Sequence, residues 1–348
     1  MGRFKLFEIR KDTCYRYVTI LGVRCKIVRG SIRKQLVQIA GTMSRLTPEQ
    51  MERLIRFSEA LVLRQINRDE IESKVENMRG SGVSGNTGEP RLVVSLTSYP
   101  GRMYDLHLCL HSLLTQTHKP DKVVLWLAEE QFPMREADVP RKVLALREFG
   151  LEIRWCPDYR SHKKIIPAVQ AFPEAAIVTA DDDLYYPADW LKKLWNSYQA
   201  AGGTGIHAHR CHRIRLKGGS ITPYQEWEKR VRDCESFPLL FPTSGGGVLY
   251  SPGSLYPEVT DVQKAMQLCP AADDVWLWGM GVLQGSRVQV VPDPEHEITY
   301  TNPMREMRLN ADGTLYSTNA AGGNDAQVAA FSAAYPQIFE KLKFCRPL

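Results

Sequence analysis

Between residues 92 and 179, short apolar runs alternate with longer segments of helical pattern. The runs are LVVSL, KVVLWL, LEIRW and AIVT, at residues 92–96, 122–127, 151–155 and 176–179. Strands that are apolar at almost every position are buried on both faces, and their alternation with helices predicts a parallel sheet covered on both sides. Right-handed crossovers place the carboxyl ends of these strands along one edge of the sheet, where ligands bind. No GxGxxG follows the first strand, which disfavours a dinucleotide-binding fold.

Helices are expected between these strands. The residue pattern predicts them over 104–116, 140–149 and 163–171, and Pro140 suits the first position of its helix. The predicted fold class is therefore α/β, with a Rossmann-like, mostly parallel sheet flanked by helices.

The fourth apolar run leads directly into three aspartates, Asp181, Asp182 and Asp183. Adjacent carboxylates repel one another unless a cation or solvent screens them. At the carboxyl end of a buried strand they would lie in the ligand crevice, and hard oxygen ligands suit Mg²⁺ or Mn²⁺, which in turn hold a diphosphate. The alternative is an exposed acidic turn before the helix that begins near Pro187.

Two further segments carry residue types that suit a ligand site. Gly245, Gly246 and Gly247 precede an apolar strand and allow the backbone to approach a ligand closely, although a turn or bulge would also use them. Asp273 and Asp274 precede a helix that is apolar almost all round. Asp273 would also serve there simply as a helix N-cap.

Three histidines lie close together in the sequence, at His207, His209 and His212. On a strand His207 and His209 share a face, whereas His212 points elsewhere. Zinc sites usually have four ligands, and no partner cluster is visible. We therefore expect a strand with basic neighbours that faces the acceptor through His209, rather than a zinc site.

The order of these motifs carries a family resemblance. TADDDLYYP, at residues 179–187, resembles the DXD region of GT-A fold glycosyltransferases. The segment from Arg91 to about Arg287 resembles bacterial family 2-like glycosyltransferases of surface-polysaccharide (lipopolysaccharide or capsule) synthesis. The other matching stretches are VSLTSYPGR, SLLTQ, KPDK, SHKK, GGGVLY and ADDVW. The resemblance implies a nucleotide-sugar donor, most simply a UDP-sugar, Mn²⁺ or Mg²⁺, and transfer to a hydroxyl of a glycan or lipid-linked acceptor.

The resemblance also implies donor-binding residues. Thr97, Tyr99 and Arg102 follow the first strand, where such enzymes hold the base and ribose; Tyr99 would stack on a base and Arg102 would reach a phosphate. Lys163 and Lys164 open a predicted helix after a serine and are candidate contacts to the diphosphate. The alternatives are a simple Tyr-Pro turn and solvated surface lysines.

The same resemblance assigns the metal ligands. Asp183 is the expected direct ligand, Asp181 belongs to the ribose or metal shell, and Asp182 bridges or supports them. A late histidine, His296, is expected to reach the metal.

The catalytic base is expected at Asp274, with Asp273 as the second choice. An alcohol that attacks an anomeric carbon needs a carboxylate within hydrogen-bond reach. A single in-line displacement would invert the anomeric centre. The glycine run 245–247, with His209, is expected to face the acceptor or the donor sugar.

Two other functions compete with this interpretation. A sugar-nucleotide nucleotidyltransferase has a similar sheet and metal carboxylate, but needs a Gly-rich, Arg-containing loop after the first strand, whereas TSYPGR has one glycine. A catalytically inactive glycan-binding scaffold would not need two separate carboxylate groups.

The first part of the chain is strongly basic. Residues 1–34 hold ten Lys/Arg against two Asp/Glu, a net charge of +8 on a chain whose total is +6. Such a segment is attracted to an anionic inner-membrane surface, at about 1 kcal/mol per basic residue, unless it is only a solvated face. No nucleic-acid partner is expected.

Three regions are predicted: a basic β-hairpin with a helical extension over 1–79, a flexible linker over the Gly/Ser-rich 80–89, and a catalytic domain over 90–348. The hairpin turns near Leu21, and the helix from Thr47 has a Thr cap, a first-position Pro and Gln50 in a capping box.

Composition points to the cytoplasm. No apolar stretch of membrane-spanning length and no secretory signal are visible. The eight cysteines form no CxxC, so a zinc site or disulfide framework is not expected. The protein is expected in the cytoplasm, peripheral on the inner membrane at most.

Overall fold

The computed structural model describes strands 7–11, 16–20 and 23–27, then residues 47–52, 55, 58, 69, 73, 78–89, 91–232, 239–292, 298–302 and 322–343. The chain forms two compact units, Met1–Glu70 and Ile71–Leu348. No helix of the described residues is both long and apolar enough to cross a membrane.

The first unit contains an antiparallel sheet of three strands, β1 (Phe7–Lys11), β2 (Arg16–Ile20) and β3 (Val23–Ile27). Ile20 pairs with Val23, so the predicted hairpin near Leu21 is confirmed, and β1 adds a third strand. The capping box is also confirmed, because the Gln50 amide donates to Thr47 Oγ1 (3.2 Å) and the Thr47 amide donates to Gln50 Oε1 (2.9 Å).

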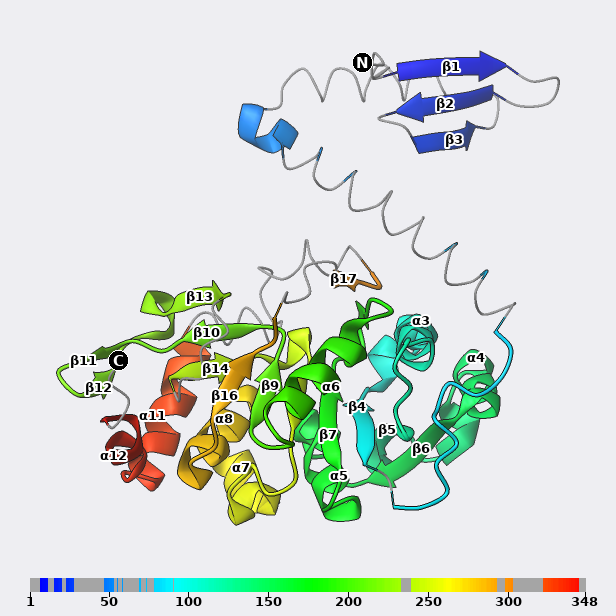
Figure 1. Cartoon of the computed structure of the whole chain (residues 1–348). Helices are drawn as coiled ribbons and strands as arrows, with labels where there is room; N and C mark the ends of the chain where they lie inside the picture. Colours follow the sequence, from blue (N-terminus) through cyan, green and yellow to red (C-terminus); the bar gives the residue numbers. More distant parts are fainter. Residues whose placement is uncertain are drawn as a thin grey trace. The chain divides into compact units, whose positions relative to one another are not determined.

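The second unit is built on a sheet of seven strands in the order β16-β9-β15-β7-β4-β5-β6 (Figure 1). Its strands are β4 (Leu92–Thr97), β5 (Lys122–Ala128), β6 (Leu151–Cys156), β7 (Ala176–Ala180), β9 (Ile206–Ala208), β15 (Val248–Tyr250) and β16 (Val288–Val290). All neighbours pair in parallel except β15, which is antiparallel to both β7 and β9. The predicted, mostly parallel α/β sheet is therefore confirmed.

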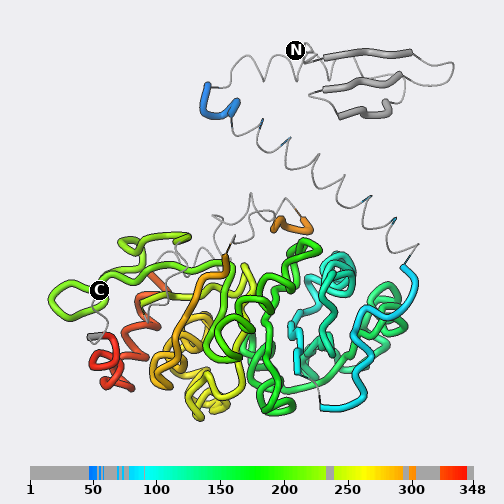
Figure 2. The backbone as a smooth tube through the Cα atoms, in the orientation of Figure 1, coloured from blue at the N-terminus to red at the C-terminus, as the bar shows by residue number. Residues whose placement is uncertain are grey.

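Helices cover both faces of this sheet. They are α3 (Met103–Leu114), α4 (Arg141–Leu144), α5 (Ile166–Ala171), α6 (Trp190–Ala200), α7 (Val262–Leu268), α8 (Asp273–Gln284), α11 (Asn324–Ala334) and α12 (Ile338–Lys343). Figure 2 shows the chain from Asn324 to Lys343 at one end of the unit and β6 at the other.

Alternation along each strand divides the core into two clusters. On β4, Val94 and Leu96 pack in the cluster that includes side chains of α3, α4 and α6, whereas Val93 packs with those of α5 and α8. All three are fully buried. Successive strand residues point to opposite faces, so a strand that is apolar throughout fills both clusters.

Short strands complete the unit. A second sheet has the order β13-β10-β14, from β10 (Cys211–Arg213), β13 (Glu228–Val231) and β14 (Leu240–Pro242). Two small pairs are β11 (Leu216–Lys217) with β12 (Ser220–Ile221), and β8 (Leu184–Tyr185) with β17 (Thr299–Tyr300).

The residues predicted as a flexible linker are anchored to the second unit. The Gly82 amide donates to the Phe149 carbonyl (2.7 Å), the Ser84 amide donates to the Pro120 carbonyl (2.8 Å), and Gly82 is buried. Gly/Ser composition alone indicated flexibility, but these long-range hydrogen bonds hold the segment in place. The boundary between the units lies earlier, at Glu70.

The predicted helix over 163–171 also differs in the structure. A 3₁₀ turn, Arg160–Lys164, precedes α5, which begins at Ile166 with Pro167 in its first turn. Lys163 and Lys164 therefore lie at the end of a 3₁₀ turn and do not open the helix.

Candidate active site

Topology brings four separate loops to one edge of the sheet. Leu96 near the end of β4 lies beside Ala180 at the end of β7, so the segments after both strands emerge together. Because β15 is antiparallel, its first residue, Val248, pairs with Thr179 and with Ala208 at the end of β9. The segment before β15 and the segment after β9 therefore reach the same edge as the aspartates.

The loop after β4 bonds with two members of the acidic triplet, Asp182 and Asp183. Ser98 Oγ donates to Asp182 Oδ2 (2.5 Å), and the Arg102 guanidinium pairs with Asp182 and with Asp183 Oδ2 (3.1 Å). Burial alone would lower the pKa of Arg102, but the charges of Asp182 and Asp183 outweigh it and raise that pKa. Asp182 and Asp183 are only 5% and 7% exposed, so the alternative of an exposed acidic turn does not apply to them.

A buried lysine joins the triplet to the second acidic pair. Lys164 Nζ lies 2.8 Å from Asp181 Oδ1 and 2.9 Å from Asp273 Oδ2. Burial tends to lower the pKa of Lys164, yet the surrounding carboxylates raise it well above its ordinary value. Lys164 is therefore a fixed cation between two groups of aspartates that lie about ninety residues apart in the chain.

Asp274 accepts two hydrogen bonds from Ser244. Its Oδ1 accepts from both the Ser244 amide (3.0 Å) and Ser244 Oγ (2.7 Å). Lys164 Nζ in turn donates to Ser244 Oγ (2.9 Å). Within the described part of the chain no hydrogen bond reaches Asp274 Oδ2, which leaves that oxygen available to a ligand.

The two neighbouring aspartates have opposite pKa shifts. Burial would raise the pKa of Asp273, but the charges of Lys164 and His162 bring it below its ordinary value. Burial and then the negative charge of Asp273 raise the pKa of Asp274 to about 6. A carboxylate with a pKa near neutrality is matched to general-base chemistry, which favours Asp274 over Asp273.

The glycine run packs against this chain's own side chains. A Cβ at Gly246 would lie 2.7 Å from the Arg210 Cβ, and a Cβ at Gly247 would collide with the Trp190 indole. Trp190 Nε1 donates to the Gly246 carbonyl (2.8 Å), and Gly247 has φ of +93°. The glycines are thus needed for internal packing, which differs from the predicted ligand contact.

Gly245 is the member of the run that faces the site. A Cβ there would lie against the Arg210 guanidinium and 3.4 Å from Asp181 Oδ2. Arg210 follows β9 and donates from Nε to Thr243 Oγ1 (2.5 Å). Arg210 therefore brings a third cation to the edge that carries the aspartates.

The remaining donor candidates lie in different surroundings. Thr97 Oγ1 donates to the Trp126 carbonyl (2.8 Å), and Lys163 is buried and pairs with Asp158 (2.5 Å). Tyr99 is 47% exposed, with the Arg102 guanidinium 5.5 Å from its ring centroid. Of these three, only Tyr99 presents an exposed face beside the acidic triplet.

The histidines are structural. His209 is 3% exposed and its Nε2 lies 3.0 Å from the Trp190 carbonyl, so it does not face an acceptor. His207 bonds with Ser197 Oγ and the Thr204 carbonyl, and His212 accepts from the Arg230 amide. Each of the three therefore bonds with different partners. His296 lies outside the described residues.

The described residues do not by themselves assemble a metal site. No three His, Cys, Asp or Glu side chains among them are grouped to hold a metal ion. The triplet carboxylates instead face two cations, since Arg102 pairs with Asp182 and Asp183, and Lys164 pairs with Asp181. The three carboxylates of the triplet therefore form ion pairs with Arg102 and Lys164, and no catalytic step is assigned to a metal.

Sequence reasoning missed three polar residues of this site: Ser98, Arg210 and Ser244. Ser98 lies within the matched VSLTSYPGR stretch, and Ser244 directly precedes the glycine run. Adjacency to a motif was therefore the available signal. Nothing local marked Arg210, because only the pairing of β9 with β15 brings it to the glycine run.

Comparison with known proteins gave remote structural likeness only. No protein-family model matches the sequence, and no curated protein matches it. Residues 1–349 of S. aureus TarS share 14% identity at a TM-score of 0.38, covering 71% of this chain and 73% of that one; the same fragment is also solved with UDP.

Two further solved structures are similar at the same level. The mannosyltransferase PcManGT from Pyrobaculum calidifontis, in complex with GDP-Man and Mn²⁺, shares 13% identity at a TM-score of 0.38, covering 83% of this chain and 85% of that one. A CMP:2-keto-3-deoxy-manno-octonic acid synthetase with CTP shares 10% identity at a TM-score of 0.37, covering 64% and 97%. The function proposed below rests on the chain's own geometry.

Proposed function

We propose that this chain is a glycosyltransferase of the GT-A type that moves a sugar from a nucleotide-sugar donor to a hydroxyl of a glycan or lipid-linked acceptor. The observation that carries the proposal is the environment of Asp274. Its carboxylate has a pKa of about 6, and one of its oxygens accepts a hydrogen bond from Ser244. Ser244 in turn accepts from the buried Lys164, which pairs with Asp181 of the acidic triplet.

The proposed step is a single in-line displacement. The acceptor oxygen forms a bond with the anomeric carbon while the bond from that carbon to the nucleoside diphosphate breaks. Asp274 Oδ2 takes the hydroxyl proton, and the leaving diphosphate departs with the bonding electrons. Attack opposite the leaving group inverts the anomeric centre.

The cations at this edge would also stabilise the leaving diphosphate. Negative charge develops on the departing diphosphate, and prearranged positive groups stabilise it without reorganisation. Arg102 supplies such charge at the end of η1 (Pro100–Arg102), Lys164 at the end of η5 (Arg160–Lys164), and Arg210 just after β9. Tyr99 provides an exposed ring on which a nucleobase would stack.

A divalent cation remains part of the proposal. Mn²⁺ or Mg²⁺ would be held through Asp183 and Asp181, with a further ligand from outside the described residues, where His296 lies. When bound, it would neutralise diphosphate charge. Isothermal titration of Mn²⁺ in the presence of UDP tests this: Asp183→Ala should abolish the metal-dependent part of UDP binding, and unchanged binding would contradict the assignment.

The decisive experiment is product analysis. The full chain is incubated with a panel of nucleotide sugars and Mn²⁺, with and without glycan acceptors. Release of the nucleoside diphosphate is expected and supports a transferase. Pyrophosphate release from a nucleoside triphosphate and a sugar phosphate would instead show a nucleotidyltransferase. Neither product, together with glycan binding, would indicate an inactive scaffold.

The biological setting is also proposed. We place the enzyme in bacterial surface-polysaccharide synthesis, because that is what the motif resemblance implies. We place it in the cytoplasm and peripheral on the inner membrane, because residues 1–34 carry a net charge of +8. That charge is attracted to anionic lipid headgroups.

A further inference from the structure

The second unit has a small net negative charge but contains a strongly basic stretch. Residues 1–34 carry +8 and residues 35–70 are neutral, so residues 71–348 carry −2 of the chain's +6. Within them, residues 210–232 hold seven Lys/Arg against Glu226 and Glu228, a net charge of +5. The rest of the unit therefore carries −7. We call residues 210–232 the basic arm.

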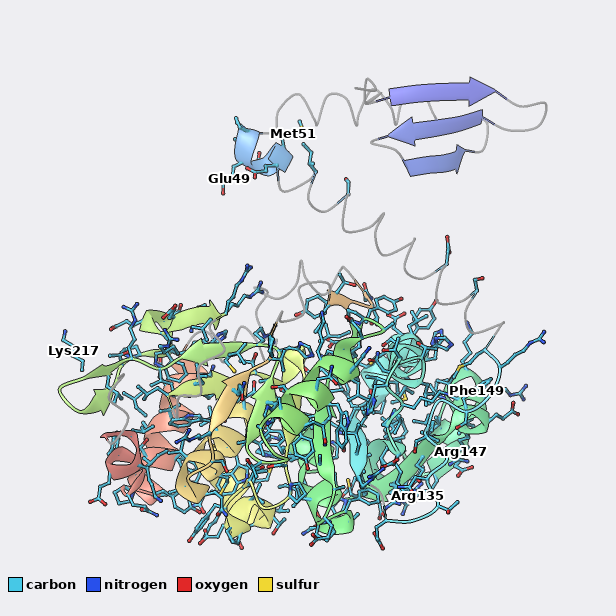
Figure 3. All side chains as sticks on the ribbon, viewed as in Figure 1. Glu49, Met51, Arg135, Arg147, Phe149 and Lys217 are labelled. Atoms are coloured by element: carbon cyan, nitrogen blue, oxygen red, sulfur yellow. The ribbon has the colours of Figure 1, made fainter. Side chains whose placement is uncertain are left out.

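The basic arm displays its cations on ordered backbone. It runs through β10, the β11–β12 hairpin and β13. Gly218 and Gly219, with φ of +60° and +83°, form the two-residue turn of that hairpin, as a tight hairpin of this length requires. Five of its basic side chains are exposed: Arg215, Lys217, Lys229, Arg230 and Arg232. Figure 3 shows Lys217 near the hairpin, directed away from the body of the unit.

The described contacts of the arm include an ion pair and a cation–π contact. Arg213 pairs with Glu228 (3.2 Å). Lys229 Nζ lies over the Tyr224 ring, 3.1 Å from its centroid, in a cation–π contact. Burial lowers the pKa of Lys229 to about 8, so the side chain is still mostly protonated near neutral pH. Cations held on two short sheets in an otherwise acidic unit attract an anionic partner and repel a cationic one.

The basic arm begins inside the candidate active site. Its first residue, Arg210, lies beside Gly245 and Asp181. From there β10 leads outward, paired on one side with β14 and on the other with β13. A chain-like ligand whose reacting end sits near Asp274 and which extends along β10 toward the β11–β12 hairpin would meet these cations.

We propose that the basic arm binds an anionic acceptor glycan, one that carries carboxylate or phosphate groups on the sugars behind the reacting hydroxyl. This inference rests on the proposed glycosyltransferase function and specifies its acceptor class.

A soluble polyanion fits better than a lipid surface. Proteins that lie on membranes add exposed apolar side chains to their basic ones. The large exposed apolar side chains of the described residues are Ile55, Tyr99, Tyr104 and Met134, and none belongs to the basic arm.

The test uses the full chain and two defined probes: a heparin-derived octasaccharide as the anionic glycan and a maltooctaose as the neutral one. The arm variant is Arg215→Glu/Lys217→Glu/Arg230→Glu. The control variant, Arg141→Glu/Lys142→Glu/Lys192→Glu, makes the same change of charge at exposed residues of α4 and α6. Both keep the basic residues 1–34, so their difference isolates the arm.

Two readouts are expected to agree. The anionic octasaccharide should bind the arm variant about tenfold more weakly than the control variant, the size expected when several exposed ion pairs are reversed. Added salt should shrink the difference. Hydrogen exchange should show that this probe protects amides of residues 211–231, and maltooctaose should not.

Other outcomes would overturn the inference. Equal weakening in both variants, or no protection in residues 211–231, would remove the arm as a binding surface. Loss of binding to phosphatidylglycerol vesicles in the arm variant, with octasaccharide binding intact, would identify it as a lipid contact. Donor turnover is measured separately, so arm binding without nucleoside diphosphate release would sink the transferase proposal and leave the arm standing.

Discussion

At the scale of single residues, the site is a chain of charges and hydrogen bonds. Asp181 pairs with Lys164, Lys164 donates to Ser244, and Ser244 donates to Asp274. Removing one member of a buried pair leaves an uncompensated charge. Each of these residues therefore influences the proposed base, although only Asp274 would touch the reacting proton.

Replacement of the base tests the mechanism directly. Asp274→Asn keeps the shape of the side chain but removes its ability to accept a proton, so turnover should fall by about 10²–10⁴-fold. Affinity for the nucleotide, measured by calorimetry, should stay within a fewfold of wild type. Near-normal turnover would exclude Asp274 as the base.

The pH dependence follows from the sign of the shift. Burial and Asp273 raise the pKa of Asp274 to about 6, and a base works only when it is deprotonated. We expect kcat/KM to be constant above that pKa and to fall about tenfold per pH unit below it. A profile flat down to the ordinary range of aspartate, near pH 4, would contradict the raised pKa.

Ser244 is a positioning residue, and Ser244→Ala should reveal it. The hydroxyl hydrogen bond lowers the pKa of Asp274, so its loss should move the acidic limb of the kcat/KM profile to higher pH and reduce kcat about tenfold. Ser197→Ala is the matched control, because Ser197 is also buried and bonds with His207 away from the site. A purely structural role would lower stability without moving the limb.

At the scale of elements, strand direction decides which loops meet. The parallel strands β4 and β7 place the segments after Thr97 and Ala180 side by side, and the antiparallel β15 turns Ser244–Gly247 toward them. The glycine run then packs beneath Trp190 of α6. This packing holds Ser244, and through it Asp274, in register.

Gly247→Ala tests that packing. Gly247 has φ of +93°, and a Cβ would meet the Trp190 indole. Gly253→Ala is the control, because Gly253 has φ of +70° with nothing within 4 Å of a Cβ. Both variants should lose stability through backbone strain at positive φ. Gly247→Ala should lose about 1–3 kcal/mol more, measured by urea unfolding, because its ψ of 132° lies outside the left-handed helical region and its Cβ would overpack against Trp190. Equal losses would remove the Trp190 contact as a constraint.

At the scale of the whole molecule, charge is unevenly distributed. Residues 1–34 carry +8, and the basic arm carries +5 within an otherwise acidic second unit. Two separate basic regions allow two anionic partners. We assign the inner-membrane surface to the first and the acceptor glycan to the second.

Deletion of residues 1–34 tests the first assignment. Sedimentation with phosphatidylglycerol-containing vesicles at low salt should fall, because each basic residue near such a surface contributes about 1 kcal/mol. Phosphatidylcholine vesicles are the control, and the chain should sediment little with them before or after deletion. Unchanged sedimentation with the anionic vesicles would end the tether proposal.

Local patterns were enough to predict the framework. Four apolar runs, the acidic triplet after the last of them and the Thr47 capping box were all placed correctly, because apolar periodicity and capping depend on neighbours in the chain. Local patterns gave the wrong prediction for residues 80–89, which were expected to be a flexible linker, and for Lys163, which was expected to open a helix. Distant partners, Phe149 for Gly82 and Asp158 at the β6 loop for Lys163, determine their state.

The tertiary structure decided which polar and charged side chains pair with one another. Arg102 and Asp182 lie 80 residues apart in the chain, and Ser244 and Asp274 lie 30 apart. No local propensity encodes such pairs, since they form only once β4, β7 and β15 have fixed their directions in the sheet. The residue types therefore predicted a group of carboxylates at a strand end, whereas folding distinguished the two candidates for the proposed base: Ser244 bonds with Asp274, and Lys164 pairs with Asp273.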